Sequence, residues 1–177
     1  MNRVMVIGSG GAGKSVFSLE LAQRTGLPVI HLDREYWGPG WQPMAEDRWE
    51  ARIRELVRRD RWIMDGNFGG TISIRIAAAD TVVFLDLPRL VCLWSVISRW
   101  ATFRSAARPD MTPGNADKLD LRFLRWIWSY PRTRRPGIVA QLAALPQTTQ
   151  VVRLTSRRDM RAYLAAIPAG QVGDQPA

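Results

Sequence analysis

The 177-residue sequence has little of several residue types, and each shortage removes a class of protein. Its single cysteine, Cys92, excludes an internal disulfide and offers no cysteine cluster for a metal. The most apolar stretch, residues 81–103, is interrupted by Asp86, Pro88 and Arg99, which excludes a membrane-spanning helix there. The N-terminal apolar stretch is too short for a signal peptide, so we expect a cytoplasmic protein.

Lysine is also scarce, and arginine supplies almost all of the positive charge. The two lysines are Lys14 and Lys118, although the chain has a formal net charge of +9. Residues 1–88 carry 11 basic and 11 acidic side chains, whereas residues 89–161 carry 14 basic and 4 acidic ones. Arginine binds phosphate in a bidentate manner, which favours a polyanionic partner. A GC-rich genome would also replace lysine by arginine, so composition alone leaves both explanations open.

Short β-branched runs alternate with amphipathic stretches, which is typical of βα units on a parallel sheet. The predicted strands are residues 3–7, 29–32, 62–65, 81–85 and 151–154. The predicted helices are residues 14–25, 45–59, 71–78, 90–103, 117–130, 136–145 and 156–167. We therefore expect one α/β domain over residues 1–167, followed by a disordered tail over residues 168–177 that lacks apolar periodicity.

Residues 8–15 read Gly-Ser-Gly-Gly-Ala-Gly-Lys-Ser and match the whole Walker A pattern, GxxxxGK[ST]. The match lies between a predicted strand and a predicted helix, as a P-loop requires. The backbone N–H groups of such a loop surround the phosphates of a nucleotide, and Lys14 reaches the β- and γ-phosphates. Ser15 supplies a hydroxyl to Mg²⁺. The sequence therefore predicts ATP and Mg²⁺ as cofactors. The predicted nucleotide-binding residues are Gly8, Ser9, Gly10, Gly11, Ala12, Gly13, Lys14 and Ser15.

A magnesium ion at a P-loop needs an acidic side chain from the end of a neighbouring strand. Three aspartates end predicted strands, namely Asp33, Asp65 and Asp86. Each is a candidate site residue, although aspartate also commonly ends strands for turn formation alone. Asp33 is a candidate to accept a proton from an acceptor hydroxyl or to hold a magnesium-bound water, so it is a candidate catalytic residue.

Phosphoryl transfer also needs cations around the transferring group. Arg99, Arg104 and Arg108 lie on the helix after the fourth strand or in the Pro/Gly-containing loop beyond it, where a helical lid of about residues 99–135 would sit. Arg75 follows the Asp65 loop and is a candidate to hold an anionic acceptor. The alternative for these arginines is an exposed basic helix face.

The histidine and tryptophans allow weaker inferences. His31, the only histidine, alternates inside a predicted strand, and we expect it to be structural. Trp37 and Trp41 flank a Gly-Pro-Gly turn, where they would either stack on a flat acceptor or anchor the loop. Trp126 and Trp128 cannot both face the same side of a helix, so one of them is expected to be partly exposed.

Five segments together resemble the nucleoside-monophosphate-kinase group of P-loop kinases. More closely, the chain is similar to the bacterial adenylate-kinase-like proteins known as DNA topology modulation proteins. The segments that carry the resemblance are residues 8–15, 28–33, 62–67, 84–89 and 123–128.

The resemblance implies a three-layer α/β/α P-loop NTPase fold with a five-stranded parallel sheet of order 2-3-1-4-5. It further implies that Asp65 lies near the magnesium and that Arg99 is a catalytic lid arginine. The chain departs from adenylate kinases on the acceptor side: residues 65–69 lack their Pro-Arg pair, residues 32–34 replace their Thr-Gly-Asp element, and Ser95 replaces an arginine. These departures leave the acceptor open.

Two classes of function fit these features. The first is a small kinase that transfers the γ-phosphoryl group of MgATP to a small acceptor, such as a nucleotide or nucleoside. The second is a nucleotide-gated nucleic-acid-binding protein that modulates DNA topology, in which the basic second half contacts phosphates. A slow NTPase switch is a further variant. For the kinase, only weak and non-specific nucleic-acid binding is expected.

Overall fold

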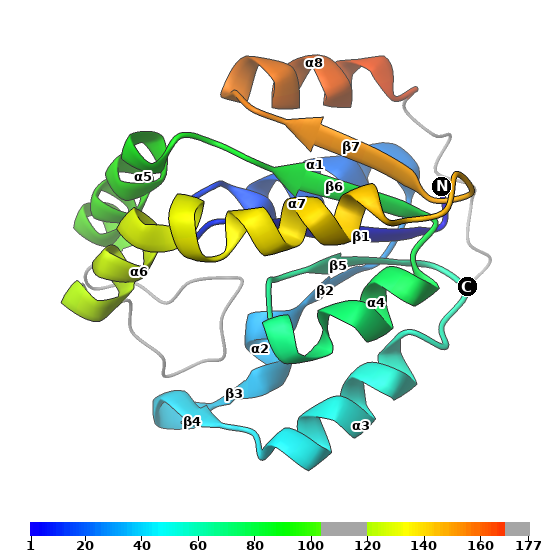
Figure 1. The fold of residues 1–177 in the computed structure, drawn as a ribbon, viewed down its shortest axis with the longest axis horizontal. Helices are drawn as coiled ribbons and strands as arrows, with labels where there is room; N and C mark the ends of the chain where they lie inside the picture. The colour runs from blue at the N-terminus through cyan, green and yellow to red at the C-terminus, as the bar shows by residue number, and fades with distance from the viewer. Residues whose placement is uncertain (104–119, 169–177) are drawn as a thin grey trace, which may run out of the picture.

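The computed structural model describes residues 1–103 and 120–168. Its centre is a parallel sheet with the spatial order β2-β5-β1-β6-β7 (Figure 1). All four strand pairings are parallel, so the carboxyl ends of the strands meet at one edge of the sheet. The strands, in spatial order, are β2 (Val29–His31), β5 (Trp62–Asp65), β1 (Arg3–Gly8), β6 (Thr81–Leu85) and β7 (Gln150–Leu154).

Two further strands in the described residues were not predicted from the sequence. β3 (Trp37–Gly38) and β4 (Gln42–Pro43) pair antiparallel in a separate two-stranded sheet, with the 3₁₀ helix η1 (Pro39–Trp41) between them. They lie between β2 and β5 in the chain. The expected strand order of 2-3-1-4-5 was numbered for five strands. With β3 and β4 included in the numbering, the order in the large sheet is 2-5-1-6-7. Strands of two residues are too short for alternation to reveal them.

The described helices follow the predicted ones, apart from α2, which was not predicted and begins at Leu32, the last residue of a predicted strand. Two of them begin with a side-chain cap: the Ser156 hydroxyl accepts from Asp159 N–H before α8, and the Asp120 carboxylate accepts from Arg122 N–H before α6. Among these residues no helix is long and apolar enough to cross a membrane. The helices are α1 (Lys14–Thr25), α2 (Leu32–Tyr36), α3 (Glu46–Leu56), α4 (Ile72–Ala78), α5 (Arg89–Phe103), α6 (Leu121–Thr133), α7 (Arg135–Ala143) and α8 (Arg157–Ala166), with the 3₁₀ helix η2 (Gly69–Thr71) before α4.

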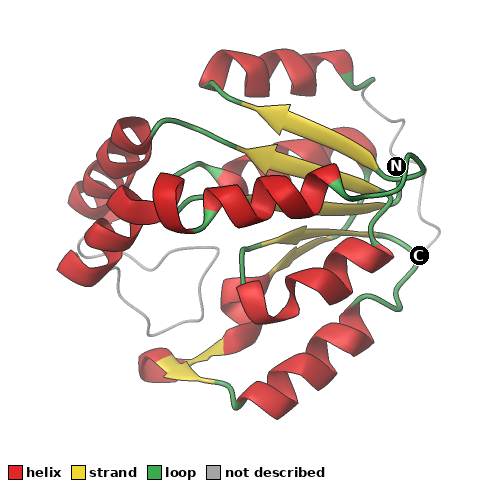
Figure 2. Ribbon diagram, in the orientation of Figure 1, coloured by secondary structure: helices red, strands yellow, loops and turns green. Residues whose placement is uncertain are grey.

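Helices cover both faces of the sheet (Figure 2). The core consists of two apolar clusters, one on each face. Alternate side chains of β1 enter different clusters, with Val4 and Val6 on one face and Met5 and Ile7 on the other. The first cluster includes residues of α1, α5, α6 and α8, and the second includes residues of α3, α4 and α7. The fold is therefore a three-layer α/β/α arrangement. The buried Cys92 belongs to the first cluster, and burial raises the pKa of its thiol.

The carboxyl edge of the sheet is where β1 turns into α1 and where α2, α5 and α6 gather (Figure 1). Of the expected lid, residues 104–119 lie outside the described residues, and so does most of the expected tail. The described part of the lid comprises the end of α5 and all of α6, and these two helices contact one another. This edge is the place where a ligand is expected in an open parallel sheet.

Candidate active site

The P-loop has the backbone geometry that its sequence predicts. Gly11 and Gly13 have φ values of 76° and 88°, which favour glycine, and α1 begins directly after them. The first turn of α1 contains no acidic side chain. The positive end of the helix dipole is therefore directed at the loop without a competing carboxylate from its own first turn.

Two glycines of the loop are required by close packing from distant segments. A Cβ atom on Gly10 would lie 2.5 Å from Cζ of Phe123 on α6. A Cβ atom on Gly11 would lie 2.2 Å from the backbone oxygen of Cys92 on α5. Helices α5 and α6 therefore rest directly on the loop, and any larger side chain at either position would displace them.

The side chain of Lys14 folds over its own loop. Its Nζ donates hydrogen bonds to the carbonyl oxygens of Gly8 and Ser9, both at 3.1 Å. A phosphate in the loop would compete with these neutral carbonyls for the ammonium protons. Because charge-assisted hydrogen bonds are roughly twice as strong as neutral ones, the phosphate is the stronger acceptor.

The loop that follows β5 is fixed to the P-loop by Asn67. Its side-chain amide makes hydrogen bonds to both the N–H and the carbonyl oxygen of Gly8. Sequence reasoning missed this residue because no spacing rule connects it to a glycine 59 positions earlier.

Arg75 does not lie where the sequence analysis expected it. Its side chain is fully buried, and its guanidinium donates to the carbonyl oxygens of Gly66, Asn67 and Phe68. Burial lowers the pKa of Arg75 to about 9, which keeps it charged at neutral pH. The expected role in binding an anionic acceptor is therefore not supported: Arg75 does not line the cavity described below, and both of its terminal amino groups donate to the loop.

His31 and Asp65 form a pair at the carboxyl ends of β2 and β5. The two residues are Cα partners in the strand register, and His31 Nδ1 lies 3.0 Å from Asp65 Oδ2. Asp65 is 5% exposed, so this contact occurs in a largely dry part of the edge. His31 was expected to be structural. The signal for this pair in the sequence was that both residues end strands. The pair could not be predicted from it, because the sequence does not show which strands are neighbours.

Asp86, the third strand-ending aspartate, is neutralised by two arginines. Its carboxylate accepts from Nε of Arg135 at 2.8 Å and from Nε of Arg153 at 2.8 Å. The same contact raises the pKa of Arg135. Asp86 does not line the cavity, and its carboxylate is bound by two arginines. It is therefore not a candidate magnesium ligand.

A cavity of about 1390 Å³ runs along the carboxyl edge of the sheet. Its volume exceeds that of a typical small-ligand pocket and is enough for a nucleotide with a second small molecule. Of the predicted site residues, those that line it are Gly10, Gly11, Gly13, Lys14, Ser15, Asp33, Asp65 and Arg99. Gly8, Ser9 and Ala12 belong to the loop behind this surface. Arg104 and Arg108 lie outside the described residues.

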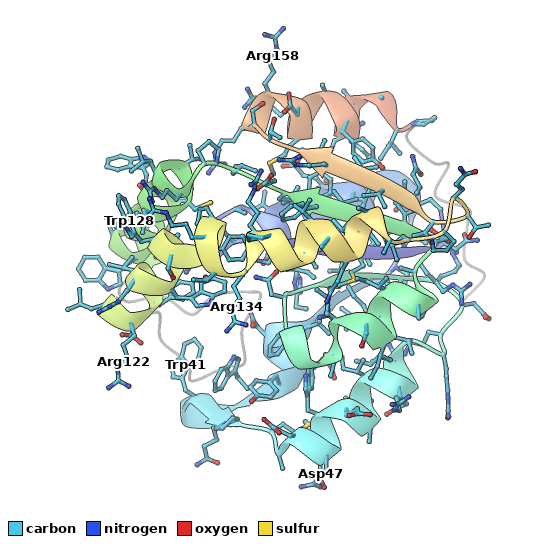
Figure 3. The ribbon with its side chains drawn as sticks, viewed as in Figure 1. Trp41, Asp47, Arg122, Trp128, Arg134 and Arg158 are labelled. Carbon is cyan, nitrogen blue, oxygen red and sulfur yellow. The ribbon has the colours of Figure 1, made fainter. Side chains whose placement is uncertain are left out.

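Several lining residues were not predicted, and some of them come from α8 and α6. Arg157 and Arg161 of α8 face the cavity, and Arg157 donates to the Ser95 hydroxyl at 2.7 Å. Trp126 of α6 also lines the cavity, whereas Trp128 lies on the outer side of the helix under Arg89, 3.8 Å from the guanidinium carbon (Figure 3). The prediction that the two tryptophans face different ways is confirmed.

The charges of the cavity are distributed unevenly between the elements that line it. Among the described lining residues, the cations Lys14, Arg99, Arg157 and Arg161 belong to the P-loop helix, α5 and α8. The segments that follow β2 and β5, which we call the β2–β5 side, contribute no lysine or arginine to the described lining. The lining residues of the β2–β5 side are His31, Asp33, Trp37, Gly40, Trp41, Asp65, Gly66, Asn67 and Phe68.

The cavity has the oxygen ligands that the magnesium ion of a magnesium–nucleotide complex requires. Ser15 and Asp65 both line it, so a hydroxyl and a carboxylate oxygen are present beside the loop. Mg²⁺ prefers oxygen ligands and usually takes only one or two from protein, the rest coming from phosphates and water. The described residues contain no cluster of three or more His, Cys, Asp or Glu side chains that would hold a metal without the nucleotide.

Comparison with known proteins agrees with the geometry at the level of the fold. A family model described as isopentenyl transferase matches residues 1–36, which include β1, the P-loop, α1 and β2. This match covers too little of the chain to define its family. No curated protein matches significantly in sequence.

Solved structures of small kinases match nearly the whole chain. A gluconokinase from Sinorhizobium meliloti 1021 is 18% identical with a TM-score of 0.54, and the match covers 94% of this chain and 93% of that one. A shikimate kinase from Acinetobacter baumannii, solved with shikimate, is 15% identical with a TM-score of 0.52, covering 94% and 90%. A sugar kinase from Janibacter sp. HTCC2649 is 17% identical with a TM-score of 0.50, covering 93% of each chain. The protein therefore has the fold of small P-loop kinases.

Proposed function

We propose that the protein is a small kinase that transfers the γ-phosphoryl group of MgATP to a hydroxyl group of a small acceptor. The observation that carries this proposal is a single cavity that contains the P-loop residues Lys14 and Ser15 together with Asp33 and Asp65. A nucleotide switch would need Lys14, Ser15 and a magnesium carboxylate such as Asp65, but it would not need Asp33. Asp33 and the remaining volume on the β2–β5 side supply what a second substrate requires.

Each residue has a role that follows from its position. The P-loop N–H groups and Lys14 bind the β- and γ-phosphates, and Arg99 from α5 offsets the charge that develops on the transferring group. The acceptor oxygen attacks the γ-phosphorus, the bond to the β–γ bridging oxygen breaks, and ADP leaves. Asp33 is exposed at the cavity surface and accepts the proton of the acceptor hydroxyl.

Ser15 and Asp65 would hold the magnesium ion, which supplies charge neutralisation between the β- and γ-phosphates when bound. The contact from His31 at 3.0 Å engages Oδ2 of Asp65 and would orient the carboxylate of this lining residue. His31 is therefore a positioning residue for Asp65.

The fold supports the proposal without identifying the acceptor. The gluconokinase, shikimate kinase and sugar kinase that share the fold are kinases by name. The closer resemblance to adenylate-kinase-like proteins stays a proposal, as does the assignment of ATP over GTP. Kinases on this fold thus give a reason to test hydroxylated acceptors of several chemical classes.

The direct test measures ADP release from MgATP across a panel of nucleosides, nucleoside monophosphates, sugars and small acids. We expect at least one acceptor to raise ADP release well above the rate with water alone. Lys14→Ala should abolish this release and the thermal stabilisation by MgATP, whereas Arg58→Ala, which removes a charge at an exposed position outside the cavity, should leave both unchanged. Full stabilisation of Lys14→Ala by MgATP would contradict the proposal.

A further inference from the structure

We propose that the outer side of α5, together with the adjoining side of α6, docks on the surface of an anionic lipid bilayer. We call these two sides the outer face; its residues are Leu90, Trp94, Ile97, Arg125, Trp128 and Arg132. None of them lines the cavity described above, so docking would leave the candidate active site accessible. Such binding is independent of the kinase reaction and adds an interaction surface to the proposed function.

The outer side of α5 is apolar along its length. Leu90, Trp94 and Ile97 follow one another at intervals of four and three residues, so they share one side of the helix. Trp94 is 72% exposed and Leu90 is 66% exposed. The opposite side of the same helix carries Cys92 and Val96, which are buried and contact the P-loop. Helix α5 therefore has one apolar side in the core and a second one that is exposed to solvent.

Helix α6 adds a second exposed tryptophan beside this stripe. Trp128 is 46% exposed and lies under the guanidinium of Arg89, the residue before Leu90 (Figure 3). This contact places Trp128 next to the beginning of the stripe. Both helices lie at one end of the longest axis of the molecule (Figure 1), where a large flat surface can reach them. Tryptophan is enriched where lipid meets water, because its ring is apolar and its N–H is polar.

The charge of the two helices selects an anionic partner. Helix α5 contains two arginines and α6 contains three, and neither helix contains aspartate or glutamate. Arg125 and Arg132 are exposed and lie three residues before and four residues after Trp128, so they share its side of α6. Exposed apolar side chains flanked by arginine are typical of helices that lie in the interface of an anionic bilayer. The headgroups bind the guanidinium groups while the apolar side chains enter the acyl boundary.

Two other occupants fit the outer face less well. A second copy of the chain would bring its own Arg125 and Arg132 against the same arginines of the first, and like charges oppose that association. Duplex DNA would bind the arginines through its phosphates, but phosphate contacts give no reason for an exposed apolar stripe. An anionic bilayer provides both the negative charge and the apolar phase.

Flotation of the full chain with lipid vesicles tests the proposal. We expect the protein to partition onto vesicles that contain phosphatidylglycerol much more than onto vesicles of phosphatidylcholine alone, and added salt should weaken the binding. Trp94→Ser should lower the partition coefficient by about tenfold, because a large side chain no longer enters the lipid. Ile97→Thr and Val151→Thr form a matched pair, since these residues are 41% and 40% exposed. Only Ile97→Thr should weaken the binding, by about fivefold.

The charge of the outer face is tested separately. The double variant Arg125→Ala, Arg132→Ala should lower partitioning onto the anionic vesicles by about thirtyfold, at about fivefold for each arginine near the lipid surface. The control variant Arg58→Ala, Arg59→Ala removes the same charge at exposed positions that follow α3, and it should bind nearly as the wild type does. Equal losses in the two double variants would mean that net charge alone attracts the protein and would overturn the proposal.

The remaining outcomes each decide against the bilayer. Absence of wild-type binding to the anionic vesicles would overturn the proposal, and so would equal partitioning of Trp94→Ser, Ile97→Thr and the wild type. Sedimentation velocity tests the second copy: a wild-type dimer that Trp94→Ser converts to a monomer would assign the outer face to self-association. Thermal stabilisation by MgATP shows that each variant is folded. Its absence in the wild type would instead overturn the proposed function and leave the vesicle result standing.

Discussion

Asn67 and Gly8 are joined at two points: Oδ1 of Asn67 accepts from Gly8 N–H at 3.0 Å, and Nδ2 donates to the Gly8 carbonyl at 2.6 Å. Gly8 is the first residue of the P-loop, and Asn67 follows Asp65 by two positions. The two hydrogen bonds therefore hold the proposed magnesium ligand and the phosphate loop at a fixed separation. Arg75 extends this connection inward, because it holds the backbone carbonyls on both sides of Asn67 as well as that of Asn67 itself.

Replacing Asn67 by alanine should lower kcat/KM for ATP by about thirtyfold, because both bonds to the loop are lost at about 1 kcal/mol each. The loss should fall mainly on turnover, since the Gly8 carbonyl keeps its bond from Lys14. Steady-state kinetics with the best acceptor measure this effect. The control is Asn2→Ala at the exposed N-terminus. Wild-type kinetics in Asn67→Ala would show that the two hydrogen bonds between Asn67 and Gly8 do not contribute to catalysis.

Gly11→Ala should destabilise the protein and prevent MgATP binding. The added Cβ would meet a backbone oxygen at 2.2 Å and would stand at a φ of 76°, which costs an alanine about 1–2 kcal/mol before the steric contact is counted. A fall in melting temperature of at least about 4 °C is expected. Gly70→Ala is the matched control, because nothing lies within 4 Å of its Cβ position. Equal melting temperatures and equal MgATP shifts in the two variants would refute the prediction.

The two cavity aspartates should be separable by their dependence on magnesium. Asp65→Asn should weaken magnesium-dependent activity and be partly rescued by excess Mg²⁺, because an amide is a poorer ligand for this ion. Asp33→Asn should reduce transfer to the acceptor while the affinity for MgATP stays near that of the wild type. Titrations of activity against Mg²⁺ and of binding against MgATP distinguish them. Large and equal losses of nucleotide affinity in both variants would contradict this division.

Binding to duplex DNA should be weak, independent of sequence and largely lost by about 0.2 M salt, as expected for a few phosphate contacts. Two arginines of the basic second half, Arg135 and Arg153, already form ion pairs with Asp86 within the protein. Arg132 and Arg134 are exposed and better placed for phosphate contacts; Arg134 is labelled in Figure 3. Their double alanine variant should reduce the slope of log affinity against log salt by at most about 2. Tight binding at physiological salt that responds to MgATP would favour the nucleic-acid function instead.

The parts that could be predicted from the sequence are those whose signal is local. The Walker A pattern specifies its own turn, and the strand that ends at Asp65 was predicted correctly. Asp33 was expected to end a strand, but β2 ends at His31 and Asp33 lies in α2. The parts that could not be predicted depend on which strands are neighbours and in what register. His31 meets Asp65 only because β2 pairs with β5, and Asp86 is neutralised by arginines 49 and 67 positions away.

Arg75 shows the same limit for a single side chain. Its position after the Asp65 loop correctly places it near the site, but sequence does not distinguish an arginine that faces a cavity from one buried beneath a loop. Burial was decided by α4, which directs this residue into the core between Ile72 and Ile76. The available signal for burial was that Arg75 lies on the apolar face of a short helix. Ile72 lies three residues before Arg75, and Ile76 lies one residue after it.

The contacts of Phe123 and Cys92 with Gly10 and Gly11 have a consequence for the interpretation of nucleotide-binding motifs. The shape of this loop depends on helices more than 80 residues away in the chain as much as on its own eight residues. A substitution in α5 or α6 that leaves the motif intact would therefore change how the loop accommodates a triphosphate. Relatives that share the motif but carry a different residue at position 123 would be expected to differ in nucleotide affinity, and an inactive variant with a perfect motif would not be a contradiction.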